Sequence, residues 1–246
     1  MLNTLRPKVA IADYGMGNLF SVRHACEQVG LEASITTSSK EILAASAVIL
    51  PGVGAFADAM AALERLGLES VLRDIAASGR PMLGICLGMQ LLMTQSHEFG
   101  RHRGLNIVEG EVLRLKEFTG EERRLKVPHV GWNRIYGHSL ENVPGHHSAT
   151  WNGSILEGLA EGEFMYFVHS YYPLPVDSRV VLSSTPYGPI GFCSSLRFGN
   201  VFGCQFHPER SGPRGLRIYQ NFARLIRDSK WGQQNVGTTR SEIRTA

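Results

Sequence analysis

The feature of this sequence that most constrains its fold is a cysteine between two glycines, in the stretch Gly-Ile-Cys-Leu-Gly at residues 84–88. The residues before Cys86 are apolar, which predicts a buried strand, and those after it have helical spacing. The flanking glycines permit a tight and strained turn between the two elements. We therefore expect a strand-turn-helix elbow that projects the Cys86 side chain away from the sheet. Free N–H groups at the start of the helix would favour a thiolate there.

Strands and helices alternate in the first half of the sequence, which predicts parallel strand pairing with right-handed crossovers. Strands are expected in the run into Cys86 and at 8–12, 33–37 and 47–50, and helices at 19–29, 55–66 and 68–77. Later strands are expected at 107–115, 133–136, 164–171, 180–184, 190–198 and 201–206, before a last helix at 214–227. The predicted fold class is α/β, with a central, mixed, mostly parallel sheet flanked by helices and a β-rich second half. We expect one domain, residues 1–228, and a flexible polar tail, residues 229–246.

The composition argues against several classes of function. The formal net charge is only +3 and no block is rich in Lys and Arg, so a nucleic-acid partner is not expected. No apolar run approaches the roughly 20 residues that cross a membrane, and the N-terminus lacks the apolar core of a signal peptide. The four cysteines are scattered, with no pair at zinc-ligand spacing. We expect a cytoplasmic protein without a metal or cofactor, because a reducing compartment suits a working thiolate.

A histidine and a carboxylate that could activate the cysteine occur far downstream, in the stretch Gln-Phe-His-Pro-Glu at residues 205–209. Residues two apart on an extended segment share a side. Glu209 could therefore hold the tautomer of His207 while the other ring nitrogen faces Cys86. The sequence predicts a catalytic triad of these three residues.

Acyl transfer also requires hydrogen-bond donors for the oxyanion that develops in the transition state. The N–H group of Leu87, directly after the nucleophile, is one candidate. A turn containing Gly52 and Val53 is another, because it follows a strand that should lie beside the strand of Cys86.

Other residues that could carry chemistry receive plainer interpretations. The remaining cysteines lie in apolar patterns and are expected in the core; they are Cys26, Cys193 and Cys204. Six histidines fall in polar or helical surface contexts, whereas His129 and His169 are left without an assignment. The glycine-rich turn after the first strand has Phe20 at the third glycine position of a dinucleotide fingerprint, so no phosphate site is predicted there.

Together these residues resemble the class I (triad) glutamine amidotransferases, whose Gly-x-Cys-x-Gly elbow and His-x-Glu pair are matched by Cys86, His207 and Glu209. Within that family, the chain is most similar to the glutaminase subunits of imidazole glycerol phosphate synthases. Six blocks match in the order of that subfamily, at residues 13–19, 51–56, 84–90, 128–133, 166–172 and 205–209. The block Pro-His-x-Gly-Trp-Asn at 128–133 is the part specific to the subfamily.

The resemblance implies a glutaminase that forms a heterodimer with a (βα)8-barrel synthase and passes ammonia to it, in the step of histidine biosynthesis that makes imidazole glycerol phosphate and AICAR. By this analogy Cys86 attacks the amide of L-glutamine, His207 shuttles protons and Glu209 orients His207. The oxyanion would be stabilised by Leu87, Gly52 and Val53. Positions that bind the substrate in the family are matched by Gln90, Glu98, Ser170 and Tyr171. Positions at the partner interface are matched by Asn18, Trp132 and Arg210.

Departures from the family pattern leave the partner open. Arg210 stands where the family usually has a lysine that makes an interface ion pair, and arginine keeps the charge but not the shape. A paralogue that supplies ammonia to a sugar-amidating partner is therefore an alternative. Two further alternatives use the same elbow differently: a stand-alone thiol hydrolase, and a binding subunit that has lost catalysis.

Overall fold

The structure, a computed structural model, describes residues 6–119, 124–138 and 151–233. Its helices are α1 (Leu19–Gln28), α2 (Ser39–Ala44), α3 (Phe56–Arg65), α4 (Leu68–Ala77), α5 (Leu87–Leu91) and α6 (Gly212–Asp228), with 3-10 turns η1 (Ser178–Val180) and η2 (Pro208–Arg210). The first strands are β1 (Lys8–Ala12), β2 (Glu32–Thr36), β3 (Ala47–Gly52), β4 (Met82–Cys86), β5 (Gln95–Ser96), β6 (His102–Arg103) and β7 (Gly110–Arg114). The later strands are β8 (Phe118–Thr119), β9 (Arg124–Leu125), β10 (His129–Gly137), β11 (Glu163–His169), β12 (Tyr171–Pro175), β13 (Val181–Tyr187), β14 (Ile190–Phe198) and β15 (Val201–Cys204).

In the part of the chain that the structure describes, nine strands form one sheet in the order β11-β10-β13-β14-β15-β4-β3-β1-β2. The five strands from β15 to β2 pair in parallel, and the four from β11 to β14 pair antiparallel. Four further strands form a smaller sheet in the order β12-β7-β5-β6. The predicted α/β class with a mixed sheet and a β-rich second half is thereby confirmed.

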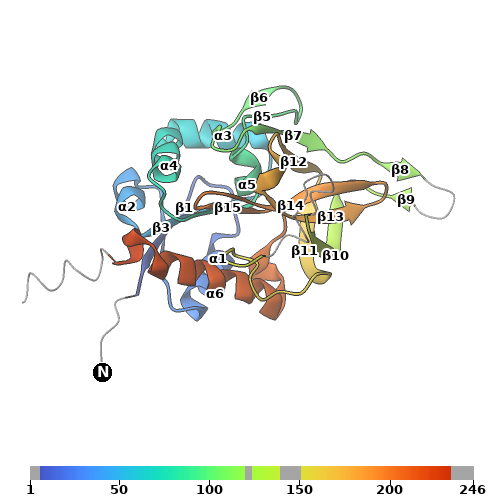
Figure 1. The fold of residues 1–246 in the computed structure, drawn as a ribbon. Helices are drawn as coiled ribbons and strands as arrows, with labels where there is room; N and C mark the ends of the chain where they lie inside the picture. Colours follow the sequence, from blue (N-terminus) through green and yellow to red (C-terminus); the bar gives the residue numbers. More distant parts are fainter. Residues whose placement is uncertain (1–5, 120–123, 139–150, 234–246) are drawn as a thin grey trace, which may run out of the picture.

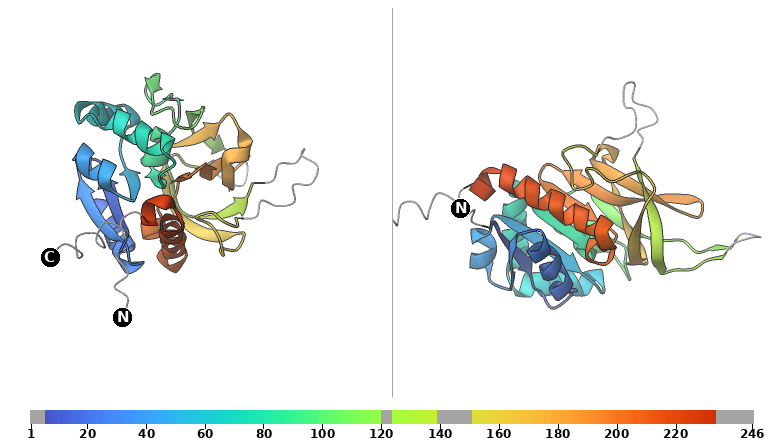
Figure 2. Two further views of the ribbon diagram at one scale, coloured as in Figure 1. Left: turned by 60° about the vertical axis from the view of Figure 1, so that its left-hand side comes forward. Right: turned by 90° about the horizontal axis from the view of Figure 1, so that it is seen from below.

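Helices cover both faces of the parallel strands, with α1 and α6 on one face and α2, α3 and α4 on the other (Figures 1 and 2). Alternate residues of one strand therefore face different helices: Ile49 of β3 belongs to the α1 and α6 side, and Leu50 to the opposite side. Strands covered on both faces read as continuous apolar runs, which is why β3 and β4 were recognisable in the sequence.

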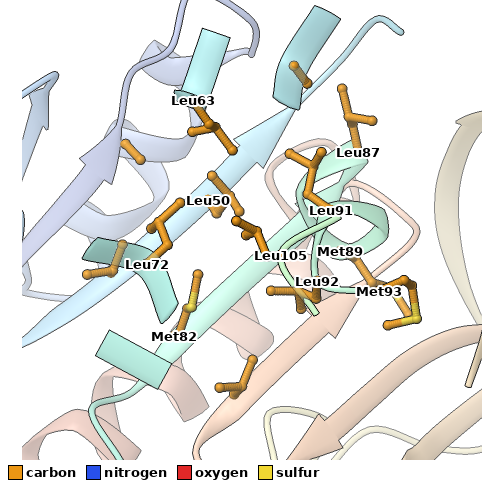
Figure 3. Packing of buried hydrophobic residues seen from close by; sticks show 14 of the residues in the cluster. Leu50, Leu63, Leu72, Met82, Leu87, Met89, Leu91, Leu92, Met93 and Leu105 are labelled. Atoms are coloured by element: carbon orange, nitrogen blue, oxygen red, sulfur yellow. The ribbon is translucent and has the colours of Figure 1, made fainter. Parts of the chain in front are cut away.

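The helix after the elbow, α5, is held against the sheet by its leucines and methionines. Leu87 and Leu91 of α5 lie near Leu50 of β3 in the same buried cluster (Figure 3). Gly88 makes this approach possible, because a Cβ atom there would lie 1.7 Å from the Leu50 carbonyl oxygen. Gly84 has the same role on β4, where a Cβ atom would lie 2.8 Å from the Gly88 carbonyl oxygen. The two flanking glycines thus allow α5 to pack closely against β3 and β4. The strained backbone conformation that was predicted for this turn is adopted by the cysteine and not by the glycines.

The prediction of one strand over 164–171 was wrong. The segment consists of two strands in different sheets, β11 in the large sheet and β12 in the small one, with Ser170 between them. The strand predicted over 107–115 was also too long, because β7 begins only at Gly110. β10 is longer than predicted and starts at His129.

The predicted tail is described only as far as residue 233, and residues 234–246 lie outside the described residues. The Trp231 ring lies beneath the Arg80 guanidinium, at 4.1 Å from ring centroid to Cζ, so the chain keeps contact with the domain past residue 228. Of the helices in the described ranges, none has the length and apolar character needed to cross a membrane.

Candidate active site

Cys86 is the last residue of β4 and the residue before α5, and its backbone is strained. Its φ and ψ are 54° and −109°, in a region that a residue with a side chain rarely adopts. Such a conformation costs about 1–3 kcal/mol, which the surrounding packing must offset. The side chain is 5% exposed and contributes to the wall of a pocket. α5 has only five residues, and the Cys86 side chain makes no cap hydrogen bond to the N–H groups of its first turn.

The end of the neighbouring strand β3 lies directly beside the nucleophile. Gly52 pairs in register with Cys86, and the next residue, Val53, contributes to the wall of the same pocket as Leu87. Gly52 has no room for a side chain, because a Cβ atom would lie 2.2 Å from the Tyr14 hydroxyl. That hydroxyl donates to the Pro51 carbonyl at 2.6 Å and so fixes the strand end. The structure therefore brings all three predicted oxyanion residues to the position of the cysteine.

His207 and Glu209 follow β15, the strand on the other side of β4. Their side chains are 4% and 1% exposed, and His207 Nδ1 lies 2.8 Å from Glu209 Oε1. The prediction that an extended segment positions them was wrong, since Glu209 belongs to the 3-10 turn η2 and His207 is its N-cap. The turn brings the carboxylate back to Nδ1, and a bond from the His207 N–H to the Tyr166 carbonyl at 2.9 Å anchors it.

Two opposing effects set the protonation of His207. Burial disfavours the imidazolium, but the Cys86 sulfur and the Glu209 carboxylate outweigh burial and raise the pKa of His207 to about 10, from an ordinary value of 6.5. At neutral pH the ring is therefore a proton donor. It is placed between a nucleophilic sulfur and a buried carboxylate, and this arrangement is suited to acyl transfer.

The pocket beside Cys86 has a volume of about 270 Å³ and takes its wall from both sheets. Every residue predicted to bind substrate contributes to that wall: Gln90, Glu98, Ser170 and Tyr171. Gln90 reaches it from α5, whereas Ser170 and Tyr171 come from the junction of β11 and β12. A Glu98 carboxylate oxygen accepts from the N–H of Phe56, at the start of α3. A larger hollow of about 960 Å³ lies between α3, α4 and the β5–β6 turn, but it contains none of the predicted site residues.

Comparison with known proteins agrees with this geometry. The family model for class-I glutamine amidotransferases matches residues 10–225, which include the elbow, the oxyanion turn and the His-x-Glu pair. The chain belongs to the class-I glutamine amidotransferases. A class-I amidotransferase is an enzyme that uses the amide nitrogen of glutamine, so the predicted enzyme class is confirmed.

Relatives named as subunits of one synthase resemble this amidotransferase over most of its length. The imidazole glycerol phosphate synthase subunit HisH of Moorella thermoacetica is 46% identical over 223 residues, 91% of this chain and 97% of that protein. The HisH subunit of Aquifex aeolicus is 45% identical over 218 residues, which cover 88% of this chain and 96% of that protein. The resemblance read from the six sequence blocks is thereby confirmed.

Solved structures share the fold at lower identity. The structure of PurLQS from Thermotoga maritima has a TM-score of 0.64 at 18% identity, and the match covers 90% of this chain and 100% of that one. A crystal structure described as a glutamine amidotransferase has a TM-score of 0.63 at 19% identity and covers 89% and 98%. These likenesses show that the amidotransferase has the common fold of such domains.

The two histidines left without an assignment form a buried pair beside the pocket of the amidotransferase, and His169 contributes to the pocket wall. His129 Nδ1 lies 3.1 Å from His169 Nε2, and both side chains are at most 6% exposed. Burial lowers the pKa of His129 to about 4 and, together with the neighbouring His129, lowers the pKa of His169 to about 3. Both rings are therefore neutral over the physiological range. His129 also stacks on Phe167, with ring centroids 5.0 Å apart.

The residues predicted to meet a partner lie on the surface of the amidotransferase. Asn18 precedes α1 and is exposed, and the Trp132 ring on β10 is 56% exposed. Trp132 packs edge-on against Tyr166, with centroids 5.9 Å apart, and the Arg210 guanidinium covers the same tyrosine at 4.5 Å. An arginine stacks on an aromatic face better than the lysine usual in the family.

Two site residues were missed in the sequence. Gln205 donates through Nε2 to Cys86 Sγ at 3.6 Å, and Tyr14 holds the end of β3 by the bond described above. Gln205 stands two residues before His207, so an alternating pattern leading out of β15 could have placed both on the nucleophile's side. Nothing in the sequence around Tyr14 indicates its contact with Pro51.

Proposed function

We propose that this chain hydrolyses L-glutamine to glutamate and ammonia at Cys86, and that the ammonia passes to a separate (βα)8-barrel synthase subunit of histidine biosynthesis. The observation that carries the proposal is the convergence of Cys86 with the buried His207–Glu209 pair at the edge of a pocket. The relatives are named as subunits of imidazole glycerol phosphate synthase, which favours this partner over one that amidates a sugar. The free thiols of the described cysteines suit the reducing cytoplasm.

In the proposed mechanism, the Cys86 sulfur attacks the amide carbon of glutamine and the carbonyl oxygen becomes an oxyanion. N–H groups of Leu87 and of the Gly52–Val53 turn stabilise that charge. The tetrahedral intermediate collapses as His207 gives its proton to the leaving nitrogen, which releases ammonia and leaves a thioester on Cys86. His207, now neutral, accepts a proton from water, which attacks the thioester and releases glutamate.

The substrate-binding residues are assigned by the same proposal. Gln90, Glu98, Ser170 and Tyr171 surround the space into which the sulfur points, and a pocket of about 270 Å³ is sufficient for a single amino acid. Glu98 supplies a carboxylate suited to the ammonium group of glutamine. Asn18, Trp132 and Arg210 would meet the synthase subunit, and the exposed aromatic ring of Trp132 is typical of an interface anchor.

From the family resemblance we expect glutamine hydrolysis by the purified chain to be slow alone and roughly 10- to 100-fold faster with the barrel subunit and its nucleotide substrate, the usual size of coupling between two sites. A coupled assay for glutamate measures both rates. Activation only by a sugar-amidating synthase would replace the histidine-pathway partner. Turnover of peptides or esters without any partner would instead support a stand-alone thiol hydrolase.

The raised pKa of His207 predicts the alkaline side of the pH profile. Since the ring must be protonated to release ammonia, kcat/KM should hold through neutral pH and fall as pH rises through about 10. In a Glu209→Gln variant the carboxylate charge is lost, so this fall should move to lower pH by roughly one unit or more. The alkaline fall in kcat/KM is measured from the rate of glutamate release at a series of pH values. Glu64→Gln, on the exposed side of α3, is the control and should leave the profile unchanged.

A further inference from the structure

We propose that the hydrogen bond from the Gln205 side chain to the Cys86 sulfur stabilises the anionic form of the nucleophile. The proposal rests on the proposed role of Cys86. Gln205 Nε2 lies 3.6 Å from Cys86 Sγ, a normal length for a bond to sulfur, and the Gln205 side chain is fully buried. A hydrogen-bond donor beside a buried sulfur atom favours the charged form of that sulfur.

The orientation of the Gln205 amide follows from the Tyr171 backbone carbonyl. A carbonyl oxygen only accepts, so the Gln90 atom that lies 2.9 Å from it must be the NH2 group. The same Gln90 nitrogen lies 3.0 Å from the Gln205 side chain and donates there as well, which identifies the Gln205 atom as its oxygen. The NH2 group of Gln205 is then left to face Cys86 Sγ, and the reverse orientation would set two donors against each other.

A second chain of hydrogen bonds, through two histidines, also ends at the Tyr171 carbonyl. His169 Nδ1 lies 2.9 Å from the Tyr171 oxygen and must carry the hydrogen, so its Nε2 accepts from His129 Nδ1 at 3.1 Å. His129 Nε2 in turn accepts from Asn133 Nδ2 at 3.4 Å. The two neutral histidines thus hold the Tyr171 carbonyl in place by hydrogen bonds, and this carbonyl orients Gln90 and Gln205.

Two other groups face the sulfur. The protonated His207 ring favours the charged form, as Gln205 does, whereas the Val168 carbonyl has the opposite preference. The Val168 carbonyl lies 3.8 Å from Cys86 Sγ and accepts, so it can bond the thiol but not the thiolate. Gln205 donates, and its bond strengthens when the sulfur becomes charged. Loss of the Gln205 donor should therefore move the balance between thiolate and thiol toward the thiol.

The experiment is the rate of Cys86 alkylation by iodoacetamide as a function of pH, followed by mass mapping of the full chain without glutamine or partner. A Gln205→Glu variant keeps the acceptor for Gln90 but turns an oxygen toward the sulfur. We expect its pH midpoint to rise by about one unit or more, and its rate near neutral pH to fall about tenfold. Gln220→Glu, exposed on α6, is the control for the added charge and should match the unmodified chain.

An unchanged midpoint in folded Gln205→Glu protein would overturn the proposal. If that variant does not fold, Gln205→Met removes the donor at similar length without charge, and its midpoint should rise in the same direction by a smaller amount. Because alkylation needs neither glutamine turnover nor a synthase, these outcomes are separate from those of the partner experiment. A failure of Cys86 to react in the unmodified chain would count against its role as nucleophile instead.

Discussion

Replacing Cys86 by alanine should reduce glutamine hydrolysis by roughly 10⁴-fold or more, because no other described group can take the place of its sulfur. Replacement by glycine should be equally inactive, but the two variants should differ in stability. Alanine keeps a Cβ atom at φ 54°, whereas glycine adopts that conformation without strain. We expect the Cys86→Gly variant to be the more stable by about 1 kcal/mol, a Tm difference of about 2–4 °C.

Glutamate release with the synthase partner measures the loss of activity, and thermal unfolding measures the difference in stability. Substitution of Cys193 by alanine is the matched control, since this cysteine is buried in β14 and lies outside the pocket. The control should keep its activity and lose stability only through the smaller side chain. Equal Tm values for the alanine and glycine variants at position 86 would show that the elbow stores no strain.

The second large effect should come from Gly88→Ala, which adds a single methyl group. The new Cβ atom would lie 1.7 Å from the Leu50 carbonyl oxygen. That oxygen belongs to the backbone of a packed strand and cannot turn aside, so α5 must move off β3. We expect a loss of at least about 3 kcal/mol, a large part of the 5–15 kcal/mol that stabilises a typical domain. Soluble yield and Tm report the loss.

Gly191→Ala is the matched control for this prediction. Gly191 is exposed on β14, its φ is not among the positive values, and nothing lies within 4 Å of an added Cβ atom. The control should change stability by less than about 0.5 kcal/mol. A Gly88→Ala protein with the Tm of the control would contradict the packing described for α5.

The elbow and its neighbours were predictable because their chemistry is local. The apolar run into Cys86 identified β4, and a buried strand ending in Pro-Gly identified β3, whose register then set Gly52 beside the cysteine. The break at Ser170 was not predictable, because both β11 and β12 are β-rich and nothing in their composition marks a change of sheet. Which strands share a sheet depends on long-range pairing, and a single sequence does not encode that pairing as a local pattern.

The same distinction holds within the site. The His207–Glu209 pair could be inferred from spacing alone, although the turn that joins them was expected to be a strand. The contact of Gln205 with the sulfur depends on Gln90 and Tyr171, which are more than 30 residues away in the sequence. The orientation of a buried amide depends on all of its neighbours together. It can therefore be assigned only when the positions of those neighbours are known from the structure.

The passage of the chain from one sheet to the other at Ser170 separates two kinds of evolutionary change. The nucleophile and its histidine are fixed by the large sheet, while Ser170, Tyr171 and the region of Glu98 belong to the small sheet and its loops. Substitutions in the small sheet can therefore reshape one wall of the pocket while β4 and β15 keep the nucleophile and its histidine in place. One reaction can thus be retained while the space beside the nucleophile changes.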